Sequence, residues 1–246
     1  MGLKSVQFFN KGDRRWICLA RDPDRQNSLI DTNEYLIINK GRGILLDPGG
    51  LEIFPSVVTA VTREIDLDAI DVIFASHQDP DIISSLSMWL TVCPTVKVYA
   101  SWVWSGFIPH FGNAKPIESI PDEGMAISLG GDRDFQAIPA HYLHSSGNFS
   151  LYDPKAKILF SADIGAALLP PDKQELFVND FDDHIQYMET FHRRWMPSNK
   201  AKEAWLKRVR NLDIDYLCPQ HGGIFRRQDV QRFFDWFEKI DLGHAV

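Results

Sequence analysis

The stretch SHQDPDI, residues 76–82, has an ionisable side chain at every second position: His77, Asp79 and Asp81. It follows the apolar run Asp71–Ser76, which predicts a buried strand. Residues spaced by two in an extended loop point to the same side, so these three side chains can meet at one ligand. Alone, the H-x-D-x-D pattern is a weak signal, because Asp81 can equally be the N-cap of a following helix.

Three other segments place an ionisable side chain next to a predicted strand. His144 lies in the polar turn before the strand FSLY, Asp163 ends the apolar run ILFSAD, and His221 follows a short strand ending at Cys218. A lone histidine near a core usually has an ordinary hydrogen-bonding role. An aspartate at the end of an apolar run, however, is costly unless it is paired or bound to a cation. Together, the three imidazoles and three carboxylates are a suitable inventory for two metal ions.

Strand and helix patterns alternate along the rest of the chain, which predicts an α/β protein whose sheets are covered by helices. The predicted strands are Tyr35–Asn39, Gly43–Leu46, Asp71–Ser76, Val96–Ala100, Phe135–Ala140, Phe149–Tyr152, Ile158–Ser161 and Tyr216–Cys218, with a turn at Lys40-Gly41-Arg42. The predicted helices are Ile53–Ile65, Ile82–Val92, Asp182–Met196, Asn199–Leu212 and Asp229–Ile240. No linker or repeat interrupts them, so we expect residues 1–246 to form a single domain.

Composition excludes several classes of protein. With 44% hydrophobic and 24% charged residues, the chain is that of an ordinary globular protein. Its net charge of -7, without a basic block, argues against nucleic-acid or anionic-membrane partners. The three cysteines are widely spaced, which favours a reducing compartment. Because the N-terminus has no signal peptide pattern and no run reaches a membrane-spanning length, we expect a cytoplasmic protein.

The order of the six ionisable residues resembles the metallo-β-lactamase fold superfamily. Within it, the chain is similar to the diiron domain of flavodiiron proteins and to the related oxygen-binding diiron proteins. The superfamily pattern H-x-H-x-D-H, followed by separate His, Asp and His-Gly positions, is matched here by His77-x-Asp79-x-Asp81-Ile82, His144, Asp163 and His221. The likeness covers nearly the whole chain, and it implies a four-layer αβ/βα sandwich with two mixed β-sheets.

The same resemblance implies a binuclear metal centre. His77, Asp79 and His144 would hold one metal, Asp81 and His221 the other, and Asp163 would bridge them together with an oxo, hydroxo or peroxo species. Carboxylates mixed with imidazoles suit iron or manganese. Zinc hydrolases of this fold usually carry more histidine, so two iron ions are the preferred cofactor.

This sequence departs from the family pattern in two ways. Ile82 stands where the pattern has a histidine and cannot bind a metal. We therefore expect the second metal to bind more weakly and the apolar Ile82 side chain to leave room for dioxygen. No phosphate-binding loop typical of flavin sites is present, so we expect neither a fused flavodoxin domain nor FMN in this chain.

These features favour a non-haem diiron protein that binds dioxygen. The resemblance to the oxygen-binding diiron proteins implies that it acts as an oxygen or iron sensor linked to a chemotaxis receptor. A reductase of oxygen or nitric oxide that uses a separate electron donor is one alternative. A zinc-dependent hydrolase, in which a metal-bound hydroxide attacks its substrate, is another. The resemblance also implies a head-to-tail homodimer.

Three residues near these motifs have simpler readings. His141 is either a hydrogen-bond partner of the site or an ordinary strand-end histidine, and the second reading is favoured. Tyr142 could face bound oxygen, but packing in the core is favoured. Cys218 lies three residues from His221 and could be redox-active, but on a short apolar strand it is expected to be buried and inert.

Overall fold

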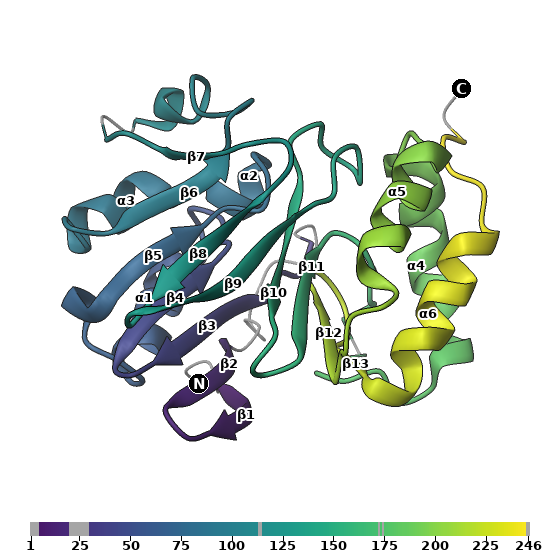
Figure 1. Ribbon diagram of the computed structural model, residues 1–246, viewed down its shortest axis with the longest axis horizontal. Coiled ribbons are helices and arrows are strands. Elements are labelled where there is room, and N and C mark those ends of the chain that lie inside the picture. Colours follow the sequence, from purple (N-terminus) through teal and green to yellow (C-terminus); the bar gives the residue numbers. More distant parts are fainter. Residues whose placement is uncertain (1–4, 20–29, 113–114, 172, 174, 245–246) are drawn as a thin grey trace.

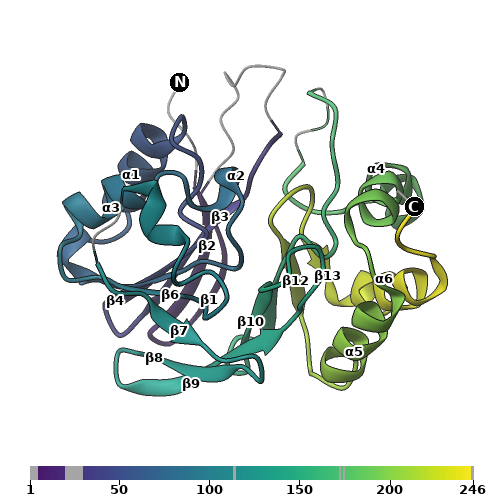
Figure 2. The same cartoon turned by 90° about the horizontal axis from the view of Figure 1, so that it is seen from above.

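Two mixed β-sheets pack face to face between two layers of helices (Figure 1 and Figure 2). The computed structural model describes residues 5–19, 30–112, 115–171, 173 and 175–244. Their arrangement is the αβ/βα sandwich expected from the sequence.

The first sheet has seven strands in chain order. They are β1 (Val6–Lys11), β2 (Arg14–Leu19), β3 (Glu34–Asn39), β4 (Arg42–Leu46), β5 (Ile70–Phe74), β6 (Lys97–Ser101) and β7 (Glu118–Ile120). Strands β1 to β4 pair antiparallel, whereas β4 to β7 pair parallel. The predicted turn between β3 and β4 is confirmed, and Lys40 and Gly41 both have positive φ angles of 51° and 74°. Two such residues give the turn a twist that matches the flanking strands.

The second sheet has six strands in the order β13-β12-β11-β10-β9-β8. Their bounds are β8 (Met125–Leu129), β9 (Asp132–Pro139), β10 (Phe149–Asp153), β11 (Ile158–Ala162), β12 (Tyr216–Pro219) and β13 (Phe225–Arg226). Only β11 and β12 pair parallel in this sheet. Both strands therefore end at the same edge, where Asp163 and His221 follow them.

Helices close the outer face of each sheet. On the first sheet lie α1 (Phe54–Thr62), α2 (Pro80–Ile83) and α3 (Leu86–Val92), and on the second α4 (Phe181–Trp195), α5 (Asn199–Val209) and α6 (Arg227–Lys239). Two short 3-10 helices, Leu67–Ala69 and Ile108–Phe111, complete the described elements. The buried apolar residues form three clusters, one between the sheets and one under each helical layer. Burial of both faces explains why the central strands are apolar throughout.

The segment Ile82–Val92 differs from the single helix predicted for it. The structure has two short helices, α2 and α3, which separate at Ser84 and Ser85. The Ser85 hydroxyl donates to the carbonyls of Pro48 and Gly49, and the Ser84 hydroxyl accepts from the Leu51 amide. The turn after β4 therefore captures both serines, and this tertiary contact ends α2.

The sequence reading also missed the N-terminal hairpin of β1 and β2. Its turn is at Gly12-Asp13, and Gly12 has a φ of 60°. The short strands β7, β8 and β13 were missed as well. In the part of the chain that the structure describes, no helix combines the length and the apolar character needed to cross a membrane.

Candidate metal centre

The six ionisable residues singled out in the sequence meet at one end of the sandwich. His77 follows β5, Asp79 is the N-cap of α2, Asp81 lies in its first turn, and His144 lies between β9 and β10. Asp163 follows β11 directly, and His221 follows β12. The parallel pairs β4–β5 and β11–β12 bring the carboxyl ends of their strands to this edge, which is how segments distant in sequence come together.

His77, Asp79 and His144 form one side of the site. The Nε2 atom of His144 is 3.2 Å from Oδ2 of Asp79, and Nε2 of His77 is 3.8 Å from the same oxygen. One ligand atom each from His77, His144 and Asp163 lies within 4.8 Å of the other two. Such a set can surround a single metal ion.

Asp163 joins this group to a second one. Its Oδ2 atom lies 2.9 Å from Nε2 of His144 and 3.3 Å from Nε2 of His77. Its Oδ1 atom faces the other way, 3.4 Å from Nε2 of His221, and that imidazole is also 3.4 Å from Oδ2 of Asp81. The two oxygens of Asp163 are thus divided between two sets of side chains, which is the geometry of a bridging carboxylate.

Hydrogen bonds fix which ring nitrogens face the centre. The Ser76 hydroxyl donates to Oδ2 of Asp47 at 2.7 Å, so it accepts the Nδ1 proton of His77 at 2.9 Å. Nδ1 of His221 donates to the Asp31 carbonyl at 2.6 Å. Both rings therefore turn Nε2 inward, the nitrogen that is left to bind a metal once it has lost its proton.

The charges at the centre favour cations. Burial lowers the pKa of His144, but its contacts with Asp163 and Asp79 raise that pKa to about 10. For His221, burial is likewise overcome by Asp163 and Asp81, and its pKa is raised to about 9. Burial alone would raise the pKa of Asp163, yet the surrounding imidazoles hold it well below its usual value. Without metal, the carboxylates attract protons onto the imidazoles, and metal ions would replace those protons.

Two buried atoms test whether the site fits a metal. Nε2 of His77 and Oδ1 of Asp163 are buried, and neither has a hydrogen-bond partner among the described residues. Buried polar atoms are normally paired, because an unsatisfied one costs free energy. Both atoms face the centre, so the donor set fits a cation placed on either side of Asp163.

Two residues that contribute to the site lie outside the six predicted ligands. Asp47 is fully buried, accepts from both the amide and the hydroxyl of Ser76, and so braces His77. It ends the apolar strand β4 just as Asp163 ends β11, so the criterion that selected Asp163 would also have found it. Phe191 on α4 lies edge-on to the ring of His144 at 6.3 Å and tilted against that of His221 at 6.2 Å. No local pattern in the sequence distinguishes it from a core phenylalanine.

The structure also places the three further residues considered in the sequence, which are His141, Tyr142 and Cys218. His141 hydrogen-bonds through Nε2 to the Asp122 carbonyl, which agrees with an ordinary strand-end histidine. Tyr142 is 53% exposed, so the prediction that it packs in the core was wrong. Cys218 is fully buried, and burial raises the pKa of its thiol well above the usual value, which agrees with an inert residue.

His192 supports the site from α4. Its Nδ1 donates to the Met188 carbonyl at 2.8 Å, and its Nε2 accepts from the Gly165 amide at 2.9 Å, just after Asp163. Acceptance at Nε2 requires the neutral ring, and burial lowers the His192 pKa from 6.5 to about 4.

We expect this pairing to make stability depend on pH. Between pH 6.5 and 4 the unfolded chain binds a proton at His192 that the folded chain excludes. The free energy of unfolding contributed by this residue should therefore fall with decreasing pH by up to about 1.4 kcal/mol per pH unit. Urea unfolding of the wild type and of His192→Gln should show a deficit in the variant at pH 7 that shrinks towards pH 4. A deficit independent of pH would contradict the assignment.

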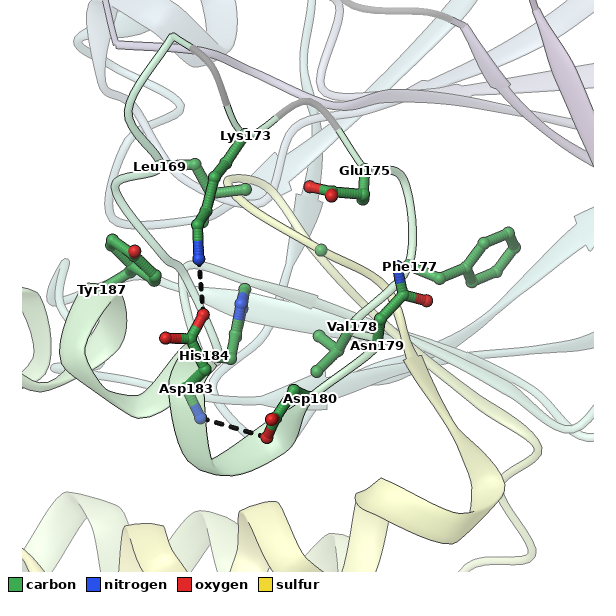
Figure 3. A pocket seen from close by; sticks show the side chains of 11 residues that line it. Leu169, Lys173, Glu175, Phe177, Val178, Asn179, Asp180, Asp183, His184 and Tyr187 are labelled. Atoms are coloured by element: carbon green, nitrogen blue, oxygen red, sulfur yellow. Dashed lines mark hydrogen bonds and ion pairs between the residues drawn. The ribbon is translucent and has the colours of Figure 1, made fainter.

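A separate pocket of about 200 Å³ lies beside the first turns of α4 (Figure 3). Lys173 and Asp183 line it and form an ion pair at 2.5 Å, and Phe177 and Val178 line it as well. None of the six residues of the metal centre lines this pocket.

Comparison with known proteins identifies the family. Residues 30–222, more than half of the chain, match the family described as "ODP family beta lactamase". The chain belongs to the ODP family. Two solved structures of ODP proteins superpose closely on it. "Peroxy diiron species of chemotaxis sensor ODP" is 40% identical, with a TM-score of 0.86 over 98% of this chain and 97% of that one. "Apo state of chemotaxis sensor ODP from T. denticola" is 41% identical, with a TM-score of 0.88 over 99% and 97%.

More distant relatives carry the same fold within longer chains. A flavo-diiron protein of Clostridium acetobutylicum, FprA2, is 23% identical over 80% of this ODP-family chain and 50% of its own length. A flavoprotein of Thermotoga maritima superposes with a TM-score of 0.82 at 22% identity, over 96% of this chain and 60% of that one. The ODP-family chain spans about half the length of the curated relatives it matches.

Proposed function

We propose that this chain is a non-haem diiron protein that binds dioxygen at a carboxylate-bridged pair of irons and signals oxygen or iron to a chemotaxis receptor. The observation that carries the proposal is the division of the two Asp163 oxygens between His77–His144 and His221. The ODP family and two solved structures described as a chemotaxis sensor support this function.

Each residue has a defined role in this proposal. His77, Asp79 and His144 hold one iron, Asp81 and His221 the other, and Asp163 bridges them. When bound, the iron pair supplies the electrons for reversible dioxygen binding. Ser76 and Asp31 keep the Nδ1 protons of His77 and His221 away from the centre.

Apolar side chains shape the surroundings of the metal pair. Phe191, 4% exposed, covers the His144 and His221 rings and excludes water on the side of α4. Ile82 is fully buried in the first turn of α2, next to Asp81. We assign it to the wall of the oxygen pocket, where its lack of a ligand atom weakens the hold on the second iron.

A second candidate is reduction of oxygen or nitric oxide with an external electron donor. Sequence relatives favour it, because the matches include a flavo-diiron protein and an "Anaerobic nitric oxide reductase flavorubredoxin" of Aeromonas salmonicida at 25% identity. The sensor function is preferred because the identity to the ODP sensor structures is much higher.

Anaerobic loading with ferrous ion, followed by air, tests the proposal. We expect two irons per chain and, on exposure to air, an absorbance band that persists without a donor and disappears when oxygen is removed. Continuous oxygen consumption with a reduced flavin donor would instead indicate a reductase. Retention of two zinc ions after purification, with no spectral response to iron and air, would contradict both diiron functions.

A further inference from the structure

A further buried carboxyl group, that of Glu34, lies next to the proposed metal centre. Glu34 is the first residue of β3 and is 2% exposed. Side chains alternate along a strand, so Glu34 points to the same face as Leu36 and Ile38. These two residues belong to the apolar cluster under the first helical layer, and Ile82 belongs to it too. Glu34 therefore lies on the Ile82 side of the sheet.

Backbone contacts place the Glu34 carboxyl group against the turn that holds Ile82. A Cβ atom added to Gly49 would lie 3.2 Å from Oε1 of Glu34. The Gly49 amide in turn donates to the Ile82 carbonyl at 2.9 Å. The carboxyl group thus sits beside the glycine turn that anchors the start of α2, where Asp81 is located.

The chain just before Glu34 packs on the loop that carries His221. The Asn33 amide donates to the Gln220 carbonyl at 2.7 Å, and the Asn33 side chain donates to the carbonyls of Pro219 and Gly222. Asp31 accepts the Nδ1 proton of His221. Glu34 is therefore held between the two segments that supply Asp81 and His221.

The protein itself pairs the Glu34 carboxyl group incompletely. Among the described residues, no hydrogen-bond partner reaches its buried Oε1 atom. Burial raises the pKa of Glu34 to about 7, whereas a hydrogen bond from Thr32 and the charge of His221 act in the opposite direction, and Asp31 raises it further. A buried carboxyl group with an unsatisfied oxygen is costly unless a cation or a donor is supplied.

The second cation position has fewer proposed ligands than the first. It has Asp81, His221 and one oxygen of Asp163, and Ile82 contributes no donor atom. We propose that Glu34 belongs to the second cation position and supplies there the negative charge that compensates for the missing donor at Ile82. This role presupposes the metal pair proposed above and adds a seventh side chain to it.

Glu34→Gln tests the proposal, because it removes the charge and keeps the shape. Anaerobic calorimetric titration with ferrous ion should resolve two binding steps in the wild type. In the variant the weaker step should lose about 10- to 100-fold in affinity, the range found for residues that support metal ligands, and the tighter step should not change. Glu118→Gln, an exposed carboxyl on β7, is the matched control and should bind as the wild type does.

A second readout separates this role from a purely structural one. Without metal, Glu34→Gln should melt at or above the wild-type temperature, since a buried unsatisfied carboxyl has been removed; its stabilisation by added iron should be smaller. The double variant Glu34→Gln/Ile82→His should regain tight binding of the second ion. The imidazole introduced at position 82 then supplies a metal ligand, which compensates for the charge removed at Glu34. If Glu34→Gln does not fold, Glu34→Met, which also removes the charge, carries the same titration.

The outcomes distinguish the two proposals. Unchanged affinity for the second ion in Glu34→Gln, with two ions bound in the wild type, overturns the role of Glu34 and leaves the diiron function intact. Lower melting of the metal-free variant with unchanged metal affinity shows a structural role and also overturns it. A wild-type protein that binds fewer than two ions overturns the diiron function itself.

Discussion

Asp163→Ala will abolish binding of both metal ions, whereas Asp81→Ala will remove only one. The reason is that Oδ2 of Asp163 faces His77 and His144 while its Oδ1 faces His221. The alanine also leaves three imidazoles without the carboxylate that holds them together. The loss should exceed the roughly 100-fold that removal of a supporting residue costs a metal site.

The measurement is iron content per chain after anaerobic loading and desalting. Circular dichroism should show that Asp163→Ala keeps its secondary structure, so that lost metal is not lost fold. Asp163→Asn is an informative companion, because it preserves shape and one oxygen but removes the charge. Retention of one full equivalent of iron by Asp163→Ala would show that the carboxylate serves only one metal, and the bridged centre would have to be abandoned.

Asp153→Ala will strongly destabilise the protein while sparing the metal centre. Asp153 is fully buried at the end of β10 and accepts from Nη1 of Arg14 at 2.6 Å and from the Trp16 indole at 2.9 Å. It also accepts from the backbone amides of Lys155 and Ala156. Removing it leaves the buried Arg14 guanidinium without its main counter-charge, and breaking such a pair costs about 3–5 kcal/mol.

Urea unfolding of the metal-free protein measures this cost. The matched control is Asp213→Ala, whose ion pairs with Lys157 and Arg227 are exposed, and it should unfold close to the wild type. The double variant Arg14→Met/Asp153→Leu should recover much of the loss, because no charge is then left buried. Iron uptake by folded Asp153→Ala should be normal, since His144 lies before the opposite end of β10. A loss below about 1 kcal/mol would show that solvent reaches Arg14.

Much of the fold was predictable because its central strands are marked by local patterns. The runs around Tyr35–Asn39 and Ile158–Ser161 are apolar throughout and bounded by turns, and the structure has β3 and β11 there. The hairpin of β1 and β2 carries charged residues on a partly exposed strand, so its pattern was too weak to identify. The break between α2 and α3 depends on the turn at Pro48 and Gly49, which lies far away in sequence.

The candidate site was likewise predictable only in part. His77, Asp79 and Asp81 follow a strand at a spacing that places them on one side of a loop, so the sequence alone could propose them together. Their association with His144, Asp163 and His221 followed from the order of motifs shared with a known fold. Glu34 escaped prediction, because it acquires its role only through neighbours brought in from other strands and helices. Asp47, in contrast, could have been selected by the criterion that selected Asp163.

The amino-acid sequence by itself determined the type of side chain: imidazoles and carboxylates that follow apolar strands and come together at one edge of the fold. Tertiary structure alone decided how the carboxylates are distributed. One oxygen of Asp163 lies beside His144 and the other beside His221, and the Glu34 carboxyl group is buried near the turn that holds Ile82. The physical reason is that donor types are properties of single residues. Distances, burial and pairing depend instead on how two sheets pack, and no local stretch of sequence contains that information.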